Sequence, residues 1–305
     1  MYYSLCPTCG ILPPQVQMDR DCGKISERRK DMEIPFVKLH GNGNDFILVD
    51  EIGLSIIPEE MKGDFARLFC DRRFGIGADG VLFLVNAEEA DYGMRLFQPD
   101  ASEAEMCGNG IRCLAKYAFD LEYVTEICTI QTLAGIMEVT MGYDDDEGVF
   151  SAAIDMGEMV FDGAGIPALS EGEYQKEIEG YTVYAVNPGV PHAVVFVEDL
   201  ESVPLMDIAP KIRFDASFPQ GANVNFVQIR SDGVLAIRTY ERGVEEETWS
   251  CGTGATASAA VAHHLGKTGN EVTVETKGGP LIIHLDDHAT MEGPAETVFE
   301  GRIVF

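Results

Sequence analysis

Two short stretches of the chain share one pattern, "MCGNGIRC" at 106–113 and "SCGTGATA" at 250–257. In each, a cysteine is followed by glycine, a polar residue and a second glycine, and then by an apolar run typical of a helix. Cys107 and Cys251 lie about half the chain apart, which indicates two similar halves. The first turn of a helix has free N–H groups and a partial positive charge, which stabilise a thiolate. Each stretch therefore predicts a reactive thiol, with glycines that let backbone amides approach a carboxylate.

Two such thiols on opposite faces of a bound carbon atom would invert its configuration. One thiolate would remove the proton from one face, and the opposite thiol would deliver a proton to the other. The helix N-termini would hold a carboxylate and stabilise the charge that develops between these steps. A single buried cysteine is more often a small hydrophobic residue. We expect this ordinary role for Cys70, Cys113 and Cys128, so the inference depends on the matched pair.

Other chemistries lack their motifs. The chain has no G-x-x-x-x-G-K-[ST] loop, and "GNGND" (41–45) and "GIGADG" (75–80) resemble dinucleotide fingerprints only loosely. The six histidines are not spaced as zinc ligands, and no lysine has the context of a pyridoxal Schiff base. These chemistries are therefore less well supported than the paired thiols.

The first 32 residues differ from the rest, because they are turn-rich and charged and have no apolar periodicity. Cys6, Cys9 and Cys22 could supply three ligands of a zinc knuckle, although no fourth ligand is evident nearby. The alternative, which we favour, is a poorly ordered N-terminal extension over residues 1–32.

Composition limits the class of protein. The 305 residues are 46% hydrophobic, enough for a substantial core, and carry a formal net charge of −29. Such a charge repels nucleic acid and anionic membranes, so we expect neither as a partner. No apolar run would span a bilayer and no secretory signal is evident. The eight cysteines are irregularly spaced, which favours a reducing, cytoplasmic location. A homodimer is the commonest assembly for such a protein.

Short strand-like runs dominate the chain after residue 32, and helices are few. The expected helices cover 59–71, 110–121 and 254–265. The clearest expected strands cover 46–50, 80–85, 92–98, 182–186, 192–199, 223–229, 234–241 and 280–287. This pattern predicts an α+β fold rather than strict βαβ alternation.

Four longer motifs together resemble the diaminopimelate epimerase family: "FVKLHGNGNDFILVD", "DRRFGIGADGVLFL", "MRLFQPDASEAEMCGNGIRC" and "YERGVEEETWSCGTGA". The resemblance covers about residues 33–305. It implies two pseudo-symmetric lobes, each a curved, mainly antiparallel sheet around a central helix, with the site between them. The expected lobes are 33–150, completed by a returning last strand at 297–305, and 151–296.

The resemblance also implies an activity without cofactor or metal, the interconversion of LL- and meso-2,6-diaminopimelate in lysine biosynthesis. Cys107 and Cys251 would be the acid/base pair. The residues expected to bind this amino-acid substrate are Asn44, Gln98, Gly108, Asn109, Asn223, Glu241, Arg242, Gly252 and Thr253. Of these, Arg242 suits the distal carboxylate and Glu241 the distal ammonium. His192 matches an auxiliary histidine that helps to set thiol protonation.

These polar residues also have ordinary interpretations. Asn44 and Asn223 are of a type common in turns, and the neighbouring Glu241 and Arg242 could form an exposed ion pair. His192 follows a proline and could be a satisfied strand residue. Their occurrence together with the paired cysteines favours the functional interpretation.

The chain departs from the family's usual motifs at a few positions. Gln98 replaces an asparagine, and Ala101 a glycine. Val190 aligns with a family asparagine that Asn187 would have to replace, and Gly80 stands where glutamine is common. These departures leave a second hypothesis open, a racemase or dehydratase of another amino acid such as a proline derivative. A third is a thiol-based metal-binding or redox protein that works through Cys6, Cys9 and Cys22.

Overall fold

The computed structural model describes residues 33–144 and 148–305. The expected extension at 1–32, with Cys6, Cys9 and Cys22, lies outside the described residues. No helix in the described ranges is both long and apolar enough to cross a bilayer.

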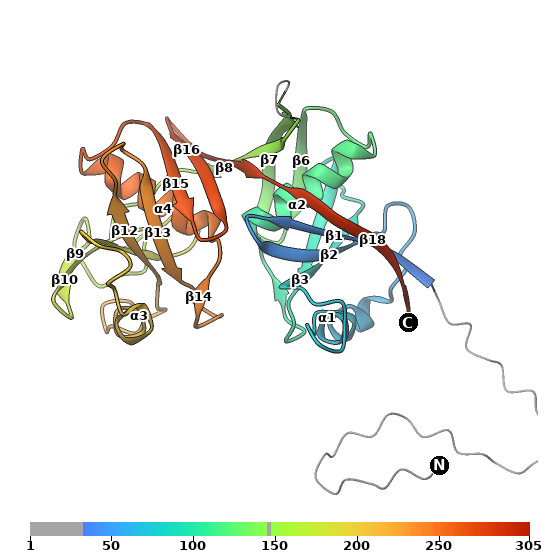
Figure 1. The fold of residues 1–305 in the computed structure, drawn as a ribbon, viewed down its shortest axis with the longest axis horizontal. Coiled ribbons are helices and arrows are strands. Elements are labelled where there is room, and N and C mark those ends of the chain that lie inside the picture. The colour runs from blue at the N-terminus through green and yellow to red at the C-terminus, as the bar shows by residue number, and fades with distance from the viewer. Residues whose placement is uncertain (1–32, 145–147) are drawn as a thin grey trace, which may run out of the picture.

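The order of elements repeats once along the chain (Figure 1). The first half contains β1 (Glu33–Gly41), β2 (Asn44–Asp50), η1 (Glu59–Met61), α1 (Lys62–Phe69), β3 (Gly80–Val85), β4 (Tyr92–Phe97), β5 (Glu103–Ala104), α2 (Gly108–Asp120), β6 (Ile127–Thr132), β7 (Gly135–Tyr143) and β8 (Phe150–Gly157). The second contains β9 (Gln175–Ile178), β10 (Tyr181–Val186), β11 (His192–Phe196), α3 (Leu205–Arg213), β12 (Asn223–Ile229), β13 (Leu235–Tyr240), β14 (Glu247–Thr248), α4 (Gly252–His264), β15 (Glu271–Thr276), β16 (Gly279–Leu285), β17 (Ala289–Pro294) and β18 (Glu296–Val304).

Strand pairing follows the same repeat. In the first half β2 runs parallel to β3 and β4 parallel to β6, and in the second half β11 runs parallel to β12 and β13 parallel to β15. The other pairings between named strands in the described ranges are antiparallel. The predicted α+β fold, with two similar and mainly antiparallel halves, is therefore confirmed.

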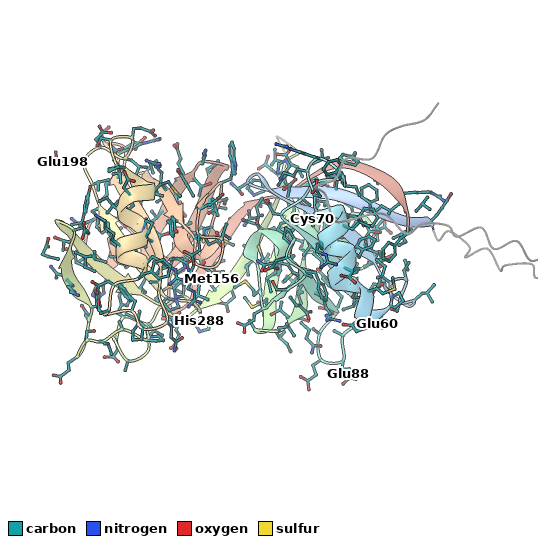
Figure 2. All side chains as sticks on the ribbon, turned by 90° about the horizontal axis from the view of Figure 1, so that it is seen from below. Glu60, Cys70, Glu88, Met156, Glu198 and His288 are labelled. Carbon is teal, nitrogen blue, oxygen red and sulfur yellow. The ribbon has the colours of Figure 1, made fainter. Side chains whose placement is uncertain are left out.

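The two halves are joined through their last strands. β8 pairs with β17, and β18 then crosses to pair with β1 in the first half (Figure 1). His288, just before β17, contacts the carboxylate of Asp155 in β8 at 3.0 Å. Figure 2 shows His288 and Met156 close to where the halves meet. The joint is therefore a continuous piece of sheet and not a flexible linker.

Each half curves its sheet around one helix. α4 contacts strands β10 to β13 and β15 to β17, and α2 contacts β1 to β4, β7, β8 and β18. Seven strands spaced about 4.8 Å apart would be far wider than a helix if they lay flat, so the sheet must wrap around it. α4 fits this position because Gly252 and residues 254–262 are all buried, as expected of a helix that is apolar on every side.

The expected helices are present, but one helix was not predicted. α2 and α4 begin at Gly108 and Gly252, two residues before the expected starts, and 59–71 forms η1 and α1. The additional helix, α3, has proline before it at Pro204 and within it at Pro210. Because proline disfavours helix interiors, this sequence pattern indicates a loop instead. It forms because Leu205, Ala209 and Ile212 face the second half's outer core.

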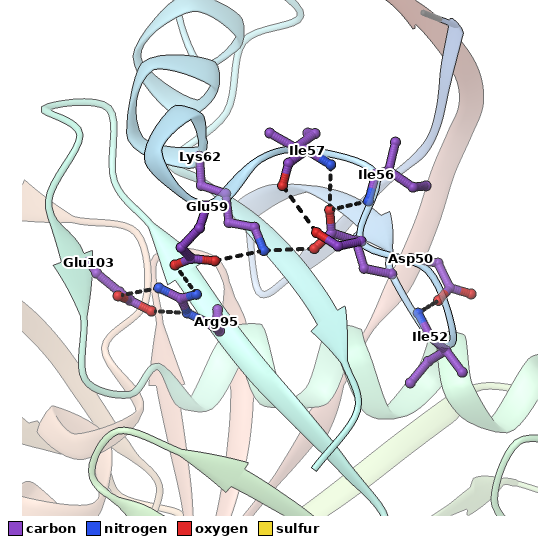
Figure 3. Close-up of polar contacts among 10 residues, drawn as sticks. Asp50, Ile52, Ile56, Ile57, Glu59, Lys62, Arg95 and Glu103 are labelled. Carbon is purple, nitrogen blue, oxygen red and sulfur yellow. Dashed lines mark hydrogen bonds and ion pairs between the residues drawn. The ribbon is translucent and has the colours of Figure 1, made fainter.

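A buried ion pair fastens η1 and α1 to the first half (Figure 3). The Glu51 carboxylate accepts the backbone N–H groups of Ile56 and Ile57 at 2.9 and 2.7 Å. Its other oxygen lies 2.7 Å from Lys62 Nζ. The chain of ion pairs continues outward through Glu59, Arg95 and Glu103. These contacts hold the segment between β2 and α1 in place.

The departure at Ala101 has a structural consequence, because its φ is +72°, a conformation that glycine adopts far more readily. We predict that Ala101→Gly makes the protein about 1 kcal/mol more stable, since an L side chain in this region is strained. Urea unfolding measures the change. Ala87→Gly is the matched control, because that loop alanine is not among the positive-φ residues and should lose stability. Equal effects of the two substitutions would contradict the prediction.

Candidate active site

Cys107 and Cys251 occupy the same position in the two halves, as the N-cap residues of α2 and α4. Both have extended backbones, with φ of −148° and −125°, so each thiol lies at the open first turn of its helix. Backbone N–H groups of Asn109 and Gly110 act on the Cys107 sulfur, and that of Gly254 acts on Cys251. These contacts lower the pKa of each thiol, as a helix start should.

The two helix starts meet at one buried side chain, Met291 of β17. A methyl group added at Gly108 would lie 2.7 Å from Met291 Cε, and one added at Gly252 would lie 2.6 Å from its Sδ. Met291 is fully buried, so neither contact could be relieved into solvent. A side chain at either glycine would therefore have to displace Met291, against which both helix starts pack.

Burial dominates the electrostatics of both thiols. It raises the pKa of Cys107 to about 11 and raises that of Cys251 further above its ordinary value. The Glu241 carboxylate raises the pKa of both thiols, so it lies near both. Burial also raises the pKa of Glu241 itself. A bound cation that neutralised the Glu241 charge would therefore favour ionisation of both thiols.

Asn44 faces Cys107 from the start of β2, directly after the Asn42–Gly43 turn. Its Oδ1 accepts from the Cys107 thiol at 3.6 Å and from Asn109 Nδ2 at 3.1 Å. Its Nδ2 donates to Asp79 at 2.7 Å, and Asp79 is held in turn by Arg72. Because the carboxylate can only accept, the amide is fixed with its oxygen toward the thiol.

His192 lies at the start of β11 in the second half. It is fully buried, with Nε2 2.9 Å from Thr253 Oγ1, which in turn lies 3.4 Å from Cys251 Sγ. Asn223 lies beside it, and its Oδ1 accepts the backbone N–H of Arg242 at 2.7 Å. Burial, assisted by the Arg242 charge, lowers the pKa of His192 to about 3. The ring is therefore neutral at physiological pH.

A buried network on Arg112 crosses between the halves. Arg112 is fully buried, and its Nη2 donates to Asn109 Oδ1 at 2.9 Å and to Asn42 Oδ1 at 2.7 Å. Its Nε donates to the Pro294 carbonyl at 3.1 Å. Asn109 Nδ2 also lies 3.2 Å from the carbonyl of Ser250, the residue before Cys251. The network thus ties the first cysteine motif to the backbone of the second.

Most of the predicted site residues come together. The residues linked by these contacts and charges are Asn44, Cys107, Asn109, His192, Asn223, Glu241, Arg242, Cys251 and Thr253, with Gly108 and Gly252 at the helix starts. Sequence reasoning missed Asp79, Arg112, Met291 and Asn225. Arg112 and Asp79 lie inside motifs quoted above, but their burial and partners depend on long-range pairing that a motif does not contain.

The departures from the family motifs lie at the edges of this arrangement. Gln98 is in a turn, where its Oε1 accepts from Ser102 at 2.9 Å. Asn187 donates to the Gly165 carbonyl at 2.8 Å. A side chain at Gly80 would meet Leu96 Cδ1 at 2.7 Å, so a leucine fills the space of a longer residue there. Among the described residues, no group of three or more His, Cys, Asp or Glu side chains is arranged to hold a metal.

Solved structures share this two-part fold. A PhzF-family phenazine biosynthesis protein from Bacillus anthracis covers 90% of this chain and 100% of its own, with a TM-score of 0.65 and 17% identity. A hydroxyproline epimerase from Agrobacterium vitis covers 91% of this chain and 94% of its own, with a TM-score of 0.63 and 19% identity. The fold and the paired helix starts therefore define a protein of this two-lobed class.

Sequence comparison identifies the family within the class. The diaminopimelate epimerase family model matches residues 36–161 and 184–298. The diaminopimelate epimerase of Methanothrix thermoacetophila is 56% identical over 273 residues, 89% of this chain and 96% of the relative. That of Archaeoglobus fulgidus is 47% identical, over 88% of this chain and 96% of the relative. The chain belongs to the diaminopimelate epimerase family, an isomerase family, and the resemblance inferred from its motifs is confirmed.

The depressed pKa of His192 predicts a stability signature. Below pH 6.5 the unfolded chain binds a proton at this histidine that the folded protein, with a His192 pKa of about 3, does not bind. His192 therefore lowers stability progressively between these values, by up to about 1.4 kcal/mol per pH unit. We expect the stability of the His192→Gln variant relative to wild type to improve as the pH falls from 7 to 5.

Urea unfolding at several pH values measures this difference. His288→Gln is the control of opposite sign, because hydrogen bonding to Asp155 raises the pKa of His288. Its contribution is present below pH 6.5 and disappears as the pH rises, so this variant should lose most at low pH. A His192→Gln difference that does not vary with pH would contradict the assignment of a buried neutral ring.

Proposed function

We propose that the protein interconverts LL- and meso-2,6-diaminopimelate through Cys107 and Cys251, as a step of lysine biosynthesis. The observation that carries this proposal is the matched pair of N-cap thiols, whose pKa values both respond to the Glu241 charge, in a chain of this family. We further propose lobes of 33–150 with 297–305 and of 151–296, with the substrate bound between them. The pairing of β18 with β1 supports the first boundary.

The proposed reaction is a proton transfer at one carbon atom. One cysteine, as thiolate, takes the α-proton onto its sulfur, and the opposite thiol gives its own proton to the other face of the carbon. Backbone N–H groups in the first turns of α2 and α4 bind the α-carboxylate and stabilise the charge that develops on it. The residues assigned to this role are Gly108, Asn109, Gly252 and Thr253. Each turnover exchanges the protonation states of the two sulfurs, so the cysteines swap roles in the reverse direction.

We assign Glu241 to the reacting end of the substrate, and not to the distal ammonium as first expected. Its carboxylate acts on both thiols, which supports a place beside the α-ammonium. Neutralising Glu241 with that ammonium would lower the pKa of both thiols, so binding would itself promote ionisation. Arg242 remains our candidate for the distal carboxylate, with Asn44, Gln98 and Asn223 as amide contacts and His192 as an auxiliary group.

We also propose that the enzyme works in the cytoplasm, as a homodimer. All cysteines in the described residues are free thiols, which supports a reducing compartment. A two-fold symmetric dimer is the commonest assembly of soluble oligomers.

The test is proton NMR of LL-diaminopimelate with reduced protein in D₂O. We expect the α-proton signal to disappear as the meso isomer forms, because each inversion delivers a deuteron from solvent-exchanged thiol. Cys107→Ala and Cys251→Ala should each lower the rate roughly a hundredfold or more. Cys70→Ala, which removes a thiol from the outer core, should retain the activity. No exchange by folded, reduced wild-type protein would refute the substrate assignment.

Replacing Glu241 tests its place at the reacting centre. Because its negative charge raises the pKa of both thiols, Glu241→Gln should move the acidic limb of the kcat/KM profile downward, by about one pH unit. KM should rise, since the ammonium loses its partner. Glu246→Gln, at an exposed position in the same loop, is the control. An acidic limb that stays in place would put Glu241 away from the thiols.

A further inference from the structure

The internal repeat provides a comparison within one molecule. Parallel pairing sets Phe46 opposite Gly80 in the first half and His192 opposite Asn223 in the second. Antiparallel pairing then sets Leu82 opposite Leu96, and Asn225 opposite Thr239. The equivalent triads are therefore Phe46, Leu82 and Leu96 below Cys107, and His192, Asn225 and Thr239 below Cys251.

The two triads occupy the same position but differ in chemistry. All six side chains are buried, with exposures of 4% or less. The fold thus accepts an apolar triad here, as the first half demonstrates with Phe46, Leu82 and Leu96. Burying a histidine, an amide and a hydroxyl in the second half is unfavourable unless each is hydrogen-bonded. The polar triad is consequently not a requirement of the fold.

Helix α4 is shaped to admit this triad. A methyl group at Gly254 would lie 2.5 Å from Asn225 Oδ1 and 3.2 Å from Thr239 Oγ1. At the equivalent Gly110, the nearest atom is Leu82 Cδ2 at 3.2 Å. The second glycine of the "CGTG" motif therefore makes room for two polar side chains.

The Asn225 amide can lie in only one orientation. Its Oδ1 accepts from the Thr239 hydroxyl at 3.0 Å, and its Nδ2 donates to the Ala193 carbonyl at 3.1 Å. If the amide were flipped, its Oδ1 would face the Ala193 carbonyl oxygen, and neither atom could donate. The positions of Oδ1 and Nδ2 are therefore assigned without ambiguity. Nδ2 also lies 3.0 Å from His192 Nδ1, so it donates to that ring nitrogen.

This orientation decides the tautomer of His192. Since Nδ1 accepts from Asn225, the proton of the neutral ring is on Nε2 and points to Thr253 Oγ1 at 2.9 Å. Asn223 Nδ2, at 3.3 Å from Nε2, donates to the Pro191 carbonyl instead, also at 3.3 Å. Thr253 Oγ1 accepts from the ring and lies 3.4 Å from Cys251 Sγ. Its own O–H therefore donates to the sulfur once Cys251 is a thiolate, because a thiolate can only accept.

We propose that Asn225, held by Thr239, is a positioning residue that fixes His192 as the Nε2–H tautomer and so directs the Thr253 hydroxyl proton to the sulfur of Cys251. The inference rests on the proposed catalytic role of Cys251. A donated hydrogen bond stabilises the thiolate, and Thr253 indeed lowers the pKa of Cys251 against burial and the Glu241 charge. Cys107 has the opposite arrangement, because its thiol donates to the oxygen of Asn44.

The charged groups nearby leave this arrangement intact. The Arg242 guanidinium disfavours protonation of His192, and burial does so more strongly. Glu241 acts on the Cys251 sulfur, not on the ring. The ring therefore acts as a fixed neutral donor, and its tautomer is the quantity to measure.

Long-range proton–nitrogen NMR correlation of ¹⁵N-histidine-labelled, reduced protein reads that tautomer directly and needs no substrate. The protein has six histidines, and His192→Gln identifies the relevant signals. Wild type should show Nε2 protonated and Nδ1 unprotonated. Asn225→Asp should reverse this, because a carboxylate beside Nδ1 can only accept.

Activity supplies the second measurement. Asn225→Asp should lower kcat roughly tenfold to a hundredfold with a smaller change in KM, because Cys251 loses a hydrogen bond to its charged form. Thr253→Val should lower kcat similarly while the Nε2–H tautomer remains. Gln228→Leu is the matched control, an amide on the same strand that bonds the Glu198 carbonyl, and should leave both readouts unchanged.

A second variant covers the case in which Asn225→Asp does not fold. Asn225→Leu combined with Thr239→Leu rebuilds the leucine pair of the first half, and His192 should then show both tautomers. A wild-type ring protonated on Nδ1 would overturn the proposal, as would a tautomer unaltered in both Asn225 variants. If wild type lacks epimerase activity but shows the expected tautomers, the proposed function fails and the positioning role stands.

Discussion

The Arg112 guanidinium is fully buried at the joint between the halves, and no carboxylate in the described part of the chain forms an ion pair with it. Burial lowers its pKa only to about 10, so it is a charged group at neutral pH. Such a group is tolerable only when its N–H groups find acceptors, and these come from Asn42, Asn109 and Pro294. Because Asn42 and Asn109 belong to the first half and Pro294 to β17, satisfying Arg112 joins the start of α2 to the second half.

The duplicated fold supplies two equivalent thiols, and local chemistry then makes them different. Both cysteines begin a central helix and both helices meet Met291, so backbone and packing treat them alike. The polar side chains around the two thiols differ. Cys107 donates to the amide oxygen of Asn44, whereas Cys251 lies beside the Thr253 hydroxyl, which is hydrogen-bonded to the His192 ring. A reversible inversion at one carbon atom needs the two thiols in equivalent positions, but it does not need their pKa values to be identical.

Local signals account for what the sequence predicted. The cysteine–glycine motifs, the α2 and α4 helices and most strands follow from residues near each other in the chain, and a family resemblance gathered Asn44, His192 and Glu241 around them. The network of Arg112 and the pair of Asn225 and Thr239 depend on strand register between distant segments, which no local pattern contains. The α3 helix was not predicted for a different reason. Its two prolines disfavour a helix, but tertiary packing nevertheless stabilises one there.

Burial of the thiols has a consequence for the proposed reaction. Burial raises the pKa of Cys107, Cys251 and Glu241, and the Glu241 charge raises the pKa of both thiols further. A thiol is much less reactive than a thiolate toward oxidants and toward another sulfur. A substrate ammonium beside Glu241 would lower the pKa of both thiols at the moment a base is needed. The same burial that makes the thiols poor bases in isolation therefore protects them and links their ionisation to the substrate.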